Sequence, residues 1–212
     1  MPEFPVAHVS SCFEQVADDL AVKGWSVQAK VFPPDLIAAL AQACRHMWQN
    51  DALTPAAIGH GSDLAVVPEI RGDYTRWLDD CSPRACQDEY LQILEELRET
   101  LNRSLYLGLD SFETHFALYP PGSGYSKHLD RFKNNPLRMV SVVAYLNQDW
   151  QPGDGGELRL HLREGVVDVA PSAGTLVVFM SDSILHEVLR AHKERASLVG
   201  WFRRRPLNPL LR

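Results

Sequence analysis

Two histidines and one aspartate have the residue types and the spacing to hold a metal ion. His128 and Asp130 lie two positions apart, and residues i and i+2 of an extended segment point to the same face. His186, which follows an apolar run, is the best candidate for a third ligand. Two imidazoles and one carboxylate form the facial triad that holds iron(II) in non-haem oxygenases and leaves positions open. We therefore expect an iron(II) ion there that activates dioxygen, although His-x-Asp alone also fits surface hydrogen bonding.

Arg195 gives this metal site a more definite chemistry. It lies on the predicted strand that follows His186, and its side chain is expected to point into the interior. A guanidinium binds a carboxylate through two parallel hydrogen bonds, and a buried arginine without an anion is costly. Tyr119 and Tyr145 lie on neighbouring predicted strands and would add phenolic hydrogen bonds. These residues favour a pocket for a small dicarboxylic acid.

The elements that must position these residues are short strands in the second half of the chain. From residue 112 onward the apolar pattern has a period of two and is rich in Val, Leu and aromatic residues. Clusters of Pro and Gly separate the strands. We expect strands at residues 112–119, 139–146, 157–162, 165–169, 175–180 and 196–203. Such a run without intervening helices indicates a sandwich or barrel, of which the jelly roll is one form.

The first half of the chain has helical spacing instead. Ser10 and Ser11 are expected to cap a helix that Gly24 ends, and a short strand is expected at residues 25–32. Pro33 and Pro34 lead into a second helix, and a third is expected at about residues 84–106. The stretch between these two helices, at about residues 52–82, is typical of a functional loop or a mobile hairpin.

The composition excludes several classes of protein. A net charge of −6 argues against a nucleic-acid binder, which needs a basic face. No apolar stretch is long enough to span a membrane, and the N-terminus lacks the pattern of a signal peptide. The four cysteines form no CxxC pair, so a thiolate zinc site is not expected. Reduced cysteines and a cytoplasmic location are the expectation.

The other histidines and glycines have ordinary structural interpretations. His115 and His161 lie in predicted strands and are expected to be structural, while His192 is expected to be solvated. Gly155 and the following glycine are expected to form a tight turn, because no helix follows them to bind a phosphate. Glu187, next to His186, fits equally well a partner of the metal ligands or a surface position.

The order of these motifs resembles one known family. The chain is similar to the 2-oxoglutarate- and iron(II)-dependent prolyl hydroxylases, in the subgroup that includes the hypoxia-inducible-factor prolyl hydroxylases of animals. The resemblance covers about residues 65–203, whereas the residues before it match only in helical character. It is carried by residues 70–73, Trp77, 119–130, 145–150, 155–158, 181–182, 186–188, Arg195 and Trp201.

The resemblance implies a role for each matching residue. The iron ligands would be His128, Asp130 and His186. The distal carboxylate of 2-oxoglutarate would bind Arg195 and Tyr145, and its pocket would be lined by Tyr119, Leu158 and Trp201. The protein substrate would be bound by Arg71, Asp73, Trp77 and Arg138, the first two forming a charged pair in a mobile loop. The segment at residues 131–137 is more basic than in the animal enzymes, so the peptide specificity is expected to differ.

The resemblance also implies an architecture. We expect one catalytic domain over residues 1–212, of the α+β class. Residues 1–106 would form a helical support region with a mobile substrate loop at about residues 65–80. Residues 107–205 would form a cupin-like double-stranded β-helix, or jelly roll.

The implied reaction is hydroxylation of a prolyl residue in a protein to 4-hydroxyproline. Dioxygen and 2-oxoglutarate would be consumed, succinate and CO2 would be formed, and ascorbate would stimulate. Bacterial relatives suggest elongation factor Tu as the substrate, and a monomer is expected, with no nucleic-acid or membrane partner. Two alternatives stay open. One is an oxygenase of the same type that acts on a free amino acid, another small molecule or a nucleobase, and the other is a non-catalytic metal-binding cupin.

Overall fold

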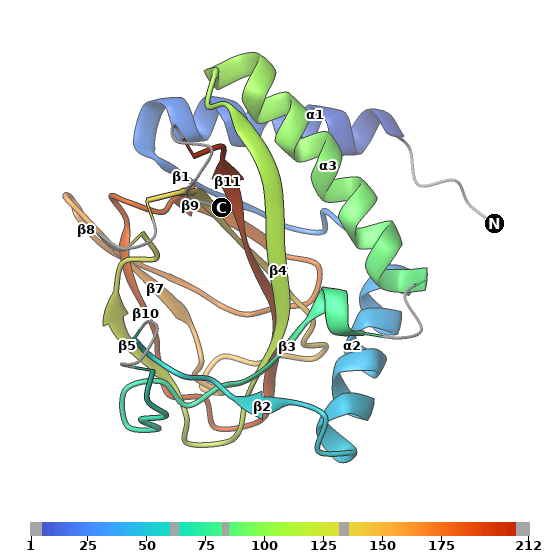
Figure 1. The fold of residues 1–212 in the computed structure, drawn as a ribbon, viewed down its shortest axis with the longest axis vertical. Helices are drawn as coiled ribbons and strands as arrows, with labels where there is room; N and C mark the ends of the chain where they lie inside the picture. Colours follow the sequence, from blue (N-terminus) through green and yellow to red (C-terminus); the bar gives the residue numbers. More distant parts are fainter. Residues whose placement is uncertain (1–5, 60–63, 82–84, 132–135, 207–212) are drawn as a thin grey trace.

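Two antiparallel sheets that face each other form the centre of this computed structural model (Figure 1). The structure describes residues 6–59, 64–81, 85–131 and 136–206, with side chains from residue 11 onward. The larger sheet has the strand order β1-β9-β6-β11-β4-β3-β2, and the smaller sheet has the order β5-β10-β7-β8. This arrangement confirms the predicted α+β class with a jelly-roll core.

The two sheets draw their strands from most of the chain. In sheet order, the larger sheet contains β1 (Trp25–Gln28), β9 (Leu176–Met180), β6 (Arg138–Tyr145), β11 (Arg195–Arg204), β4 (Leu109–Tyr119), β3 (Tyr74–Trp77) and β2 (Thr54–Pro55). The smaller sheet contains β5 (Tyr125–His128), β10 (Leu185–Val188), β7 (Leu158–Leu162) and β8 (Gly165–Val169). The six strands expected from the period-two pattern are all present, and each end lies within three residues of the expected one.

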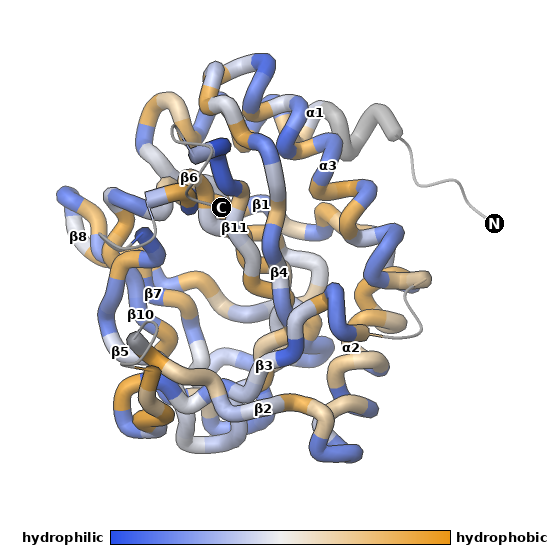
Figure 2. The backbone as a smooth tube through the Cα atoms, in the orientation of Figure 1, coloured by the Kyte–Doolittle hydropathy of each residue, from blue (hydrophilic) through white to orange (hydrophobic). Residues whose placement is uncertain are grey.

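Three helices cover the face of the larger sheet that points away from the smaller one (Figure 1). They are α1 (Val6–Lys23), α2 (Pro34–Gln49) and α3 (Ala85–Leu105). Along α3 the residues alternate between apolar and polar (Figure 2), as expected of a helix with one buried face. Its Leu94 and Leu97 belong to the same buried cluster as Phe116 and Leu118 of β4.

The long strand β4 contributes side chains to two buried clusters, because its side chains alternate between the faces of the sheet. Phe116 and Leu118 belong to the cluster beneath the helices. Ala117 and Tyr119 belong to a second buried cluster, which fills the space between the two sheets. Positions on this inner face of the strands therefore point into the jelly roll, where a site can be enclosed.

Two boundaries near the N-terminus differ from the expectation. The first helix begins at Val6, so Ser10 and Ser11 lie inside it and do not cap it. Gly24 ends it as expected, with φ of 80°. The strand expected at residues 25–32 ends at Gln28, because Lys30 adopts φ of 56° and turns the chain out of the sheet.

The stretch expected to be a functional loop or a mobile hairpin, at about residues 52–82, contains a pair of antiparallel strands. Residues 74–77 form β3, which pairs with β4 in the larger sheet, and β2 pairs with β3. A 3₁₀ turn follows at Leu78–Asp80. Residues 60–63 lie outside the described residues, and the mobility of residues 65–80 stays a prediction. Within the described part of the chain, no helix has both the length and the apolar character required to cross a bilayer.

Candidate active site

The three expected metal ligands meet where two strands of the smaller sheet pair. His128 at the end of β5 lies directly opposite His186 on β10, and Asp130 follows two residues after β5. One ligand atom from each of the three residues lies within 4.8 Å of the others. The Nε2 atoms of His128 and His186 are 3.5 Å and 3.7 Å from carboxylate oxygens of Asp130. This is the only group of this kind among the described residues.

Backbone carbonyls fix the tautomer of both histidines. Nδ1 of His128 lies 2.7 Å from the carbonyl of Ser126, and Nδ1 of His186 lies 3.1 Å from that of Ile184. A carbonyl only accepts, so each Nδ1 carries a proton and each Nε2 carries a lone pair directed at the site. Metal-binding histidines are oriented in this way in general.

The Asp130 carboxylate is buried but ionised. Burial alone would raise its pKa, but His186, His128 and a hydrogen bond from Ser141 together hold the pKa well below its ordinary value. Ser141 on β6 donates to Oδ2 of Asp130 over 2.6 Å, and its hydroxyl lies 2.8 Å from that of Ser181. Two neutral imidazoles and one anionic carboxylate are the donor set that suits iron(II) with open positions, so these residues fit that ion.

Arg195 is buried on the inner face of the larger sheet, with 1% of its surface exposed. Its Nε donates to the carbonyl of Gly156 over 2.7 Å, and its guanidinium lies 5.1 Å from the rings of both Tyr119 and Tyr145. Tyr119 and Tyr145 stand on strands β4 and β6, which flank β11 on either side. Among the described residues, no carboxylate pairs with this guanidinium. A buried cation in such surroundings fits an anionic ligand.

Two buried polar atoms nearby also lack partners. Among the described residues, nothing hydrogen-bonds to the hydroxyl of Tyr145 or to Nε1 of Trp201. Burial raises the pKa of Tyr145 to about 12, although Arg195 opposes the shift, so its phenol is a donor at neutral pH. A bound dicarboxylate would use the phenol of Tyr145 beside the guanidinium of Arg195, and these two residues therefore fit 2-oxoglutarate.

One cavity brings together most of the expected site residues. Tyr145 and Trp77 are not among its lining residues. Tyr145 lies against the guanidinium of Arg195, while Trp77 is 41% exposed. The expected residues that line the cavity are Arg71, Asp73, Tyr119, His128, Asp130, Arg138, Leu158, His186, Arg195 and Trp201.

The arginines that are expected to bind the substrate form pairs with carboxylates. Arg71 binds both carboxylate oxygens of Asp73, at 2.7 Å and 3.0 Å. Burial would lower the pKa of Arg71, but Asp73 outweighs it and the pKa is raised. Arg138 binds Glu113 over 2.7 Å and lies 3.5 Å above the ring of Trp201. Both guanidiniums are therefore held in place before any substrate is bound.

Sequence reasoning did not identify several residues of the cavity. Tyr125 stacks on His128 with 3.7 Å between ring centres, and Ser141 holds Asp130. The period-two pattern of β6, which places Ser141 on the same face as Tyr145, could have indicated the serine. His115, expected to be structural, lines the cavity. Glu187 does not reach the metal ligands, because its carboxylate binds His161 at 2.8 Å.

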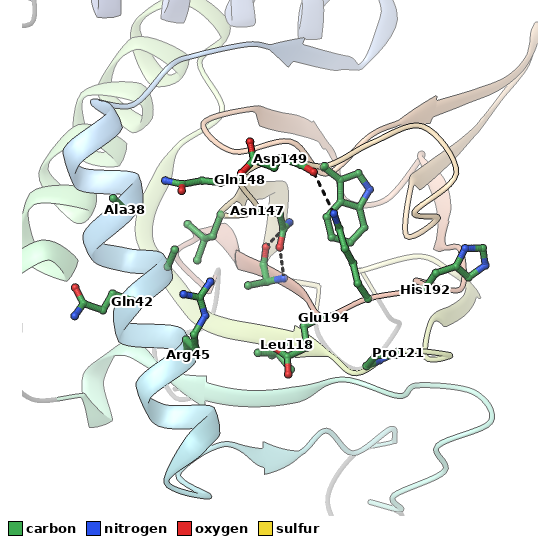
Figure 3. Close-up of a pocket in the computed structure, with 15 residues that line it drawn as sticks. Ala38, Gln42, Arg45, Leu118, Pro121, Asn147, Gln148, Asp149, His192 and Glu194 are labelled. Carbon is green, nitrogen blue, oxygen red and sulfur yellow. Dashed lines mark hydrogen bonds between the residues drawn. The ribbon is translucent and has the colours of Figure 1, made fainter.

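A wider groove of about 860 Å³ lies elsewhere, between α2 and the loops at residues 147–150 and 192–194 (Figure 3). It lies beside Leu118 and Ala196, which pack on the helix side of the larger sheet. None of its described lining residues is an expected site residue. Most of the expected site residues line the smaller, more enclosed cavity between the sheets instead.

Comparisons with known proteins identify the family of the chain. Residues 114–203 match the model of the 2OG-Fe(II) oxygenase superfamily. A crystal structure of a Pseudomonas putida prolyl-4-hydroxylase is 50% identical, with a TM-score of 0.84 over 91% of this chain and 99% of that one. A prolyl hydroxylase from Trichoplax adhaerens, solved with a peptide fragment of the hypoxia inducible factor oxygen degradation domain, has a TM-score of 0.85 over 96% of this chain and 94% of that one. It is 23% identical and therefore supports the fold alone.

The similarity extends to a human protein. Egl nine homolog 1 of Homo sapiens is 32% identical over 146 residues, which are 63% of this chain and 33% of that protein. The chain thus spans about a third of the length of this curated relative. Because nearly the full length of the Pseudomonas putida enzyme is matched at half identity, and the chain has a group of two histidines and one aspartate that could hold a metal ion, the chain belongs to the 2OG-Fe(II) oxygenase superfamily and is related to its prolyl hydroxylases.

Proposed function

We propose that this chain is an iron(II)- and 2-oxoglutarate-dependent dioxygenase that hydroxylates C4 of a prolyl residue in a protein. The observation that carries the proposal is the pairing, in one cavity, of the His128–Asp130–His186 triad with a buried Arg195 that has no carboxylate partner among the described residues. The similarity to a prolyl-4-hydroxylase supports the choice of proline.

The residues of the chain would hold and orient the reactants. When bound, iron(II) and 2-oxoglutarate supply the oxygen chemistry, in which one oxygen atom goes to the substrate and the other to succinate as CO2 is lost. His128, Asp130 and His186 would hold the metal. Arg195 would bind the distal carboxylate of 2-oxoglutarate, and Tyr145 would donate to it. The apolar side chain of Leu158, 2% exposed, would exclude water beside them.

The polypeptide would enter on the side of Arg71, Asp73, Trp77 and Arg138. We propose that residues 65–80 close over it, which would couple substrate binding to oxygen activation. We further propose elongation factor Tu as the protein substrate, on the resemblance to bacterial relatives. We also propose that the protein is a cytoplasmic monomer and that ascorbate stimulates its activity.

Mass spectrometry of elongation factor Tu, incubated with the protein, iron(II) and 2-oxoglutarate in air, tests the proposal. We expect one added oxygen atom on a proline and an equal amount of succinate. Omission of 2-oxoglutarate and the variant Arg195→Ala should each abolish the product. Oxidation of free proline without any protein product would favour a small-molecule oxygenase. Metal binding without 2-oxoglutarate turnover, with any substrate, would favour a non-catalytic cupin.

A further inference from the structure

His115 lines the active-site cavity and lies between two tryptophans. It lies on β4 directly opposite Trp77 of β3, and the two rings meet edge to face with 5.0 Å between their centres. On its other side the ring of Trp201 lies 5.6 Å away. Because Trp77 is 41% exposed, this row of rings runs from the solvent into the cavity, where an incoming substrate would pass.

The hydrogen bonding of His115 leaves one nitrogen available. Its Nδ1 lies 3.1 Å from the carbonyl of Phe116, so Nδ1 carries the proton and Nε2 carries a lone pair. Among the described residues, no group donates to this Nε2. Burial, together with the charge of Arg71, lowers the pKa of His115 to about 4. The imidazole is therefore neutral at physiological pH, and its Nε2 can accept a hydrogen bond.

The charged groups around His115 are already paired, whereas Nε1 of the neighbouring Trp201 has no partner among the described residues. Arg71 is paired with Asp73, and Arg138 is paired with Glu113. His115 itself is only 3% exposed, and it lines the cavity. The available Nε2 is therefore the feature in this part of the cavity that a ligand with a donor would complete.

The position of His115 separates it from the cosubstrate anchor. Arg195 pairs with Tyr119 on β4, whereas His115 pairs with Val199. His115 and Tyr119 are four residues apart on this strand, a separation of roughly 13 Å along an extended chain. A donor that reaches His115 would thus come from the polypeptide substrate, because the distal carboxylate of 2-oxoglutarate would lie at the other end.

We propose that His115 determines substrate specificity by accepting, at Nε2, a hydrogen bond from a residue that flanks the target proline. This inference rests on the proposed function. A prolyl residue has no N–H of its own, so the donor must belong to a neighbouring residue. A backbone amide, a hydroxyl or a carboxamide would supply such a donor.

The test uses a synthetic peptide library with one central proline and randomised flanking residues. Product is measured by mass, and peptide affinity is measured under nitrogen with iron(II) and 2-oxoglutarate bound. The variants are His115→Leu, which removes the acceptor, and His115→Gln, which keeps one. The matched control is His46→Leu, because His46 is exposed on α2. A second test uses the wild type alone. Each flanking amide of a peptide that is hydroxylated efficiently is N-methylated in turn, which removes its hydrogen-bond donor.

We expect His115→Leu to raise KM and weaken peptide affinity by about tenfold, the usual weight of one hydrogen bond, with kcat nearly unchanged. Its preference for a donor at one flanking position should disappear, while His115→Gln and His46→Leu keep that preference. For the wild type, a peptide that lacks the donor at this flanking position should likewise show a KM about ten times higher.

Each contrary result identifies what has failed. An unaltered KM and flanking preference in His115→Leu, or a wild type indifferent to the loss of every flanking donor, overturns the role of His115 and leaves the proposed function standing. Hydroxylation of no library peptide and no protein by the wild type overturns both. If His115→Leu does not fold, the donor scan on the wild type decides.

Discussion

At the scale of single residues, Ser141 links the metal site to the larger sheet. Its hydroxyl is fully buried and donates to the carboxylate of Asp130, which selects one orientation of that ligand. An oriented carboxylate binds through one oxygen and leaves the other in a hydrogen bond, so the site keeps positions open for reactants. Groups that hold ligands in this way affect metal affinity strongly although they do not touch the metal.

The variant Ser141→Ala should therefore weaken iron(II) binding by about tenfold or more. Calorimetric titration under nitrogen measures the affinity directly. Ser26→Ala is a matched control, because Ser26 is equally buried and donates to another carboxylate, that of Asp19, over 2.7 Å. Equal metal affinity in wild type and Ser141→Ala would show that the hydrogen bond does not orient the ligand.

His115 should make the stability of the fold depend on pH. Its pKa is lowered from an ordinary value of 6.5 to about 4 by burial, so between these values the unfolded chain binds a proton that the folded chain does not. The stability is thus complete above about pH 6.5 and is lost as the pH falls towards 4. Between pH 7 and pH 5 this single group should remove about 2 kcal/mol from the free energy of unfolding.

Urea unfolding of wild type and His115→Phe at the two pH values measures this contribution. The other titrating groups are common to both proteins, so the smaller loss in the variant isolates His115. Parallel losses in the two proteins would mean that His115 is protonated in the folded state or exposed in it.

The residues of the site differ in how far sequence alone could identify them. The metal ligands and Arg195 were predictable because their types are unusual for the inner face of a jelly roll. Ser141 and His115 were not, because a serine or a histidine in a strand fits many ordinary structural roles. What separates them from those roles is a contact, with Asp130 for Ser141 and with Trp77 for His115, and both contacts cross between elements.

At the scale of elements, a glycine turn positions Arg195. The carbonyl of Gly156 accepts from the guanidinium, and Gly156 has φ of 68°, which other residues rarely adopt. A Cβ at this position would lie 3.0 Å from Cδ of Arg195, 3.1 Å from Cβ of Ala191 and 3.2 Å from the ring of Trp150. The turn thus holds the arginine by both a hydrogen bond and close packing.

The variant Gly156→Ala should raise the KM for 2-oxoglutarate by about tenfold, because displacement of Arg195 weakens a buried ion pair, and it should also lower stability. Gly153→Ala is the control for backbone strain alone, since Gly153 has φ of 95° but nothing within 4 Å of its Cβ position. Assays of turnover against 2-oxoglutarate concentration compare the two. An unchanged KM in Gly156→Ala would refute the positioning role.

A helix or strand was predictable where the spacing of apolar residues within its own sequence indicates it. The six strands and the third helix have strong periodicity within their own sequence. Strands β3, β5 and β10 have four residues each, and they are strands because they pair with β4 or with each other. Such pairing depends on distant residues, so the sequence around residues 52–82 indicated a loop or a hairpin without showing where its strands lie.

At the scale of the whole molecule, the two ligand sets lie on opposite sheets. The residues that would bind iron belong to β5, to the turn that follows it and to β10 of the smaller sheet. The arginine that would bind 2-oxoglutarate begins β11 of the larger sheet. A cosubstrate bound to both the metal and Arg195 would therefore bridge the sheets, and its binding free energy would add to the stability of the whole fold.

Thermal unfolding under nitrogen should show two separate increases in Tm, one for each ligand. At a hundred times its dissociation constant each ligand adds about 2.7 kcal/mol, which raises the Tm of a domain of this size by roughly 5–10 °C. Iron(II) alone should give the first increment and 2-oxoglutarate, added after iron, the second. Arg195→Met, which keeps the bulk but removes the charge, should retain the first and lose the second. A second increment that survives in Arg195→Met would mean that the cosubstrate is bound from one sheet only, because nothing on β11 would then be required to hold it.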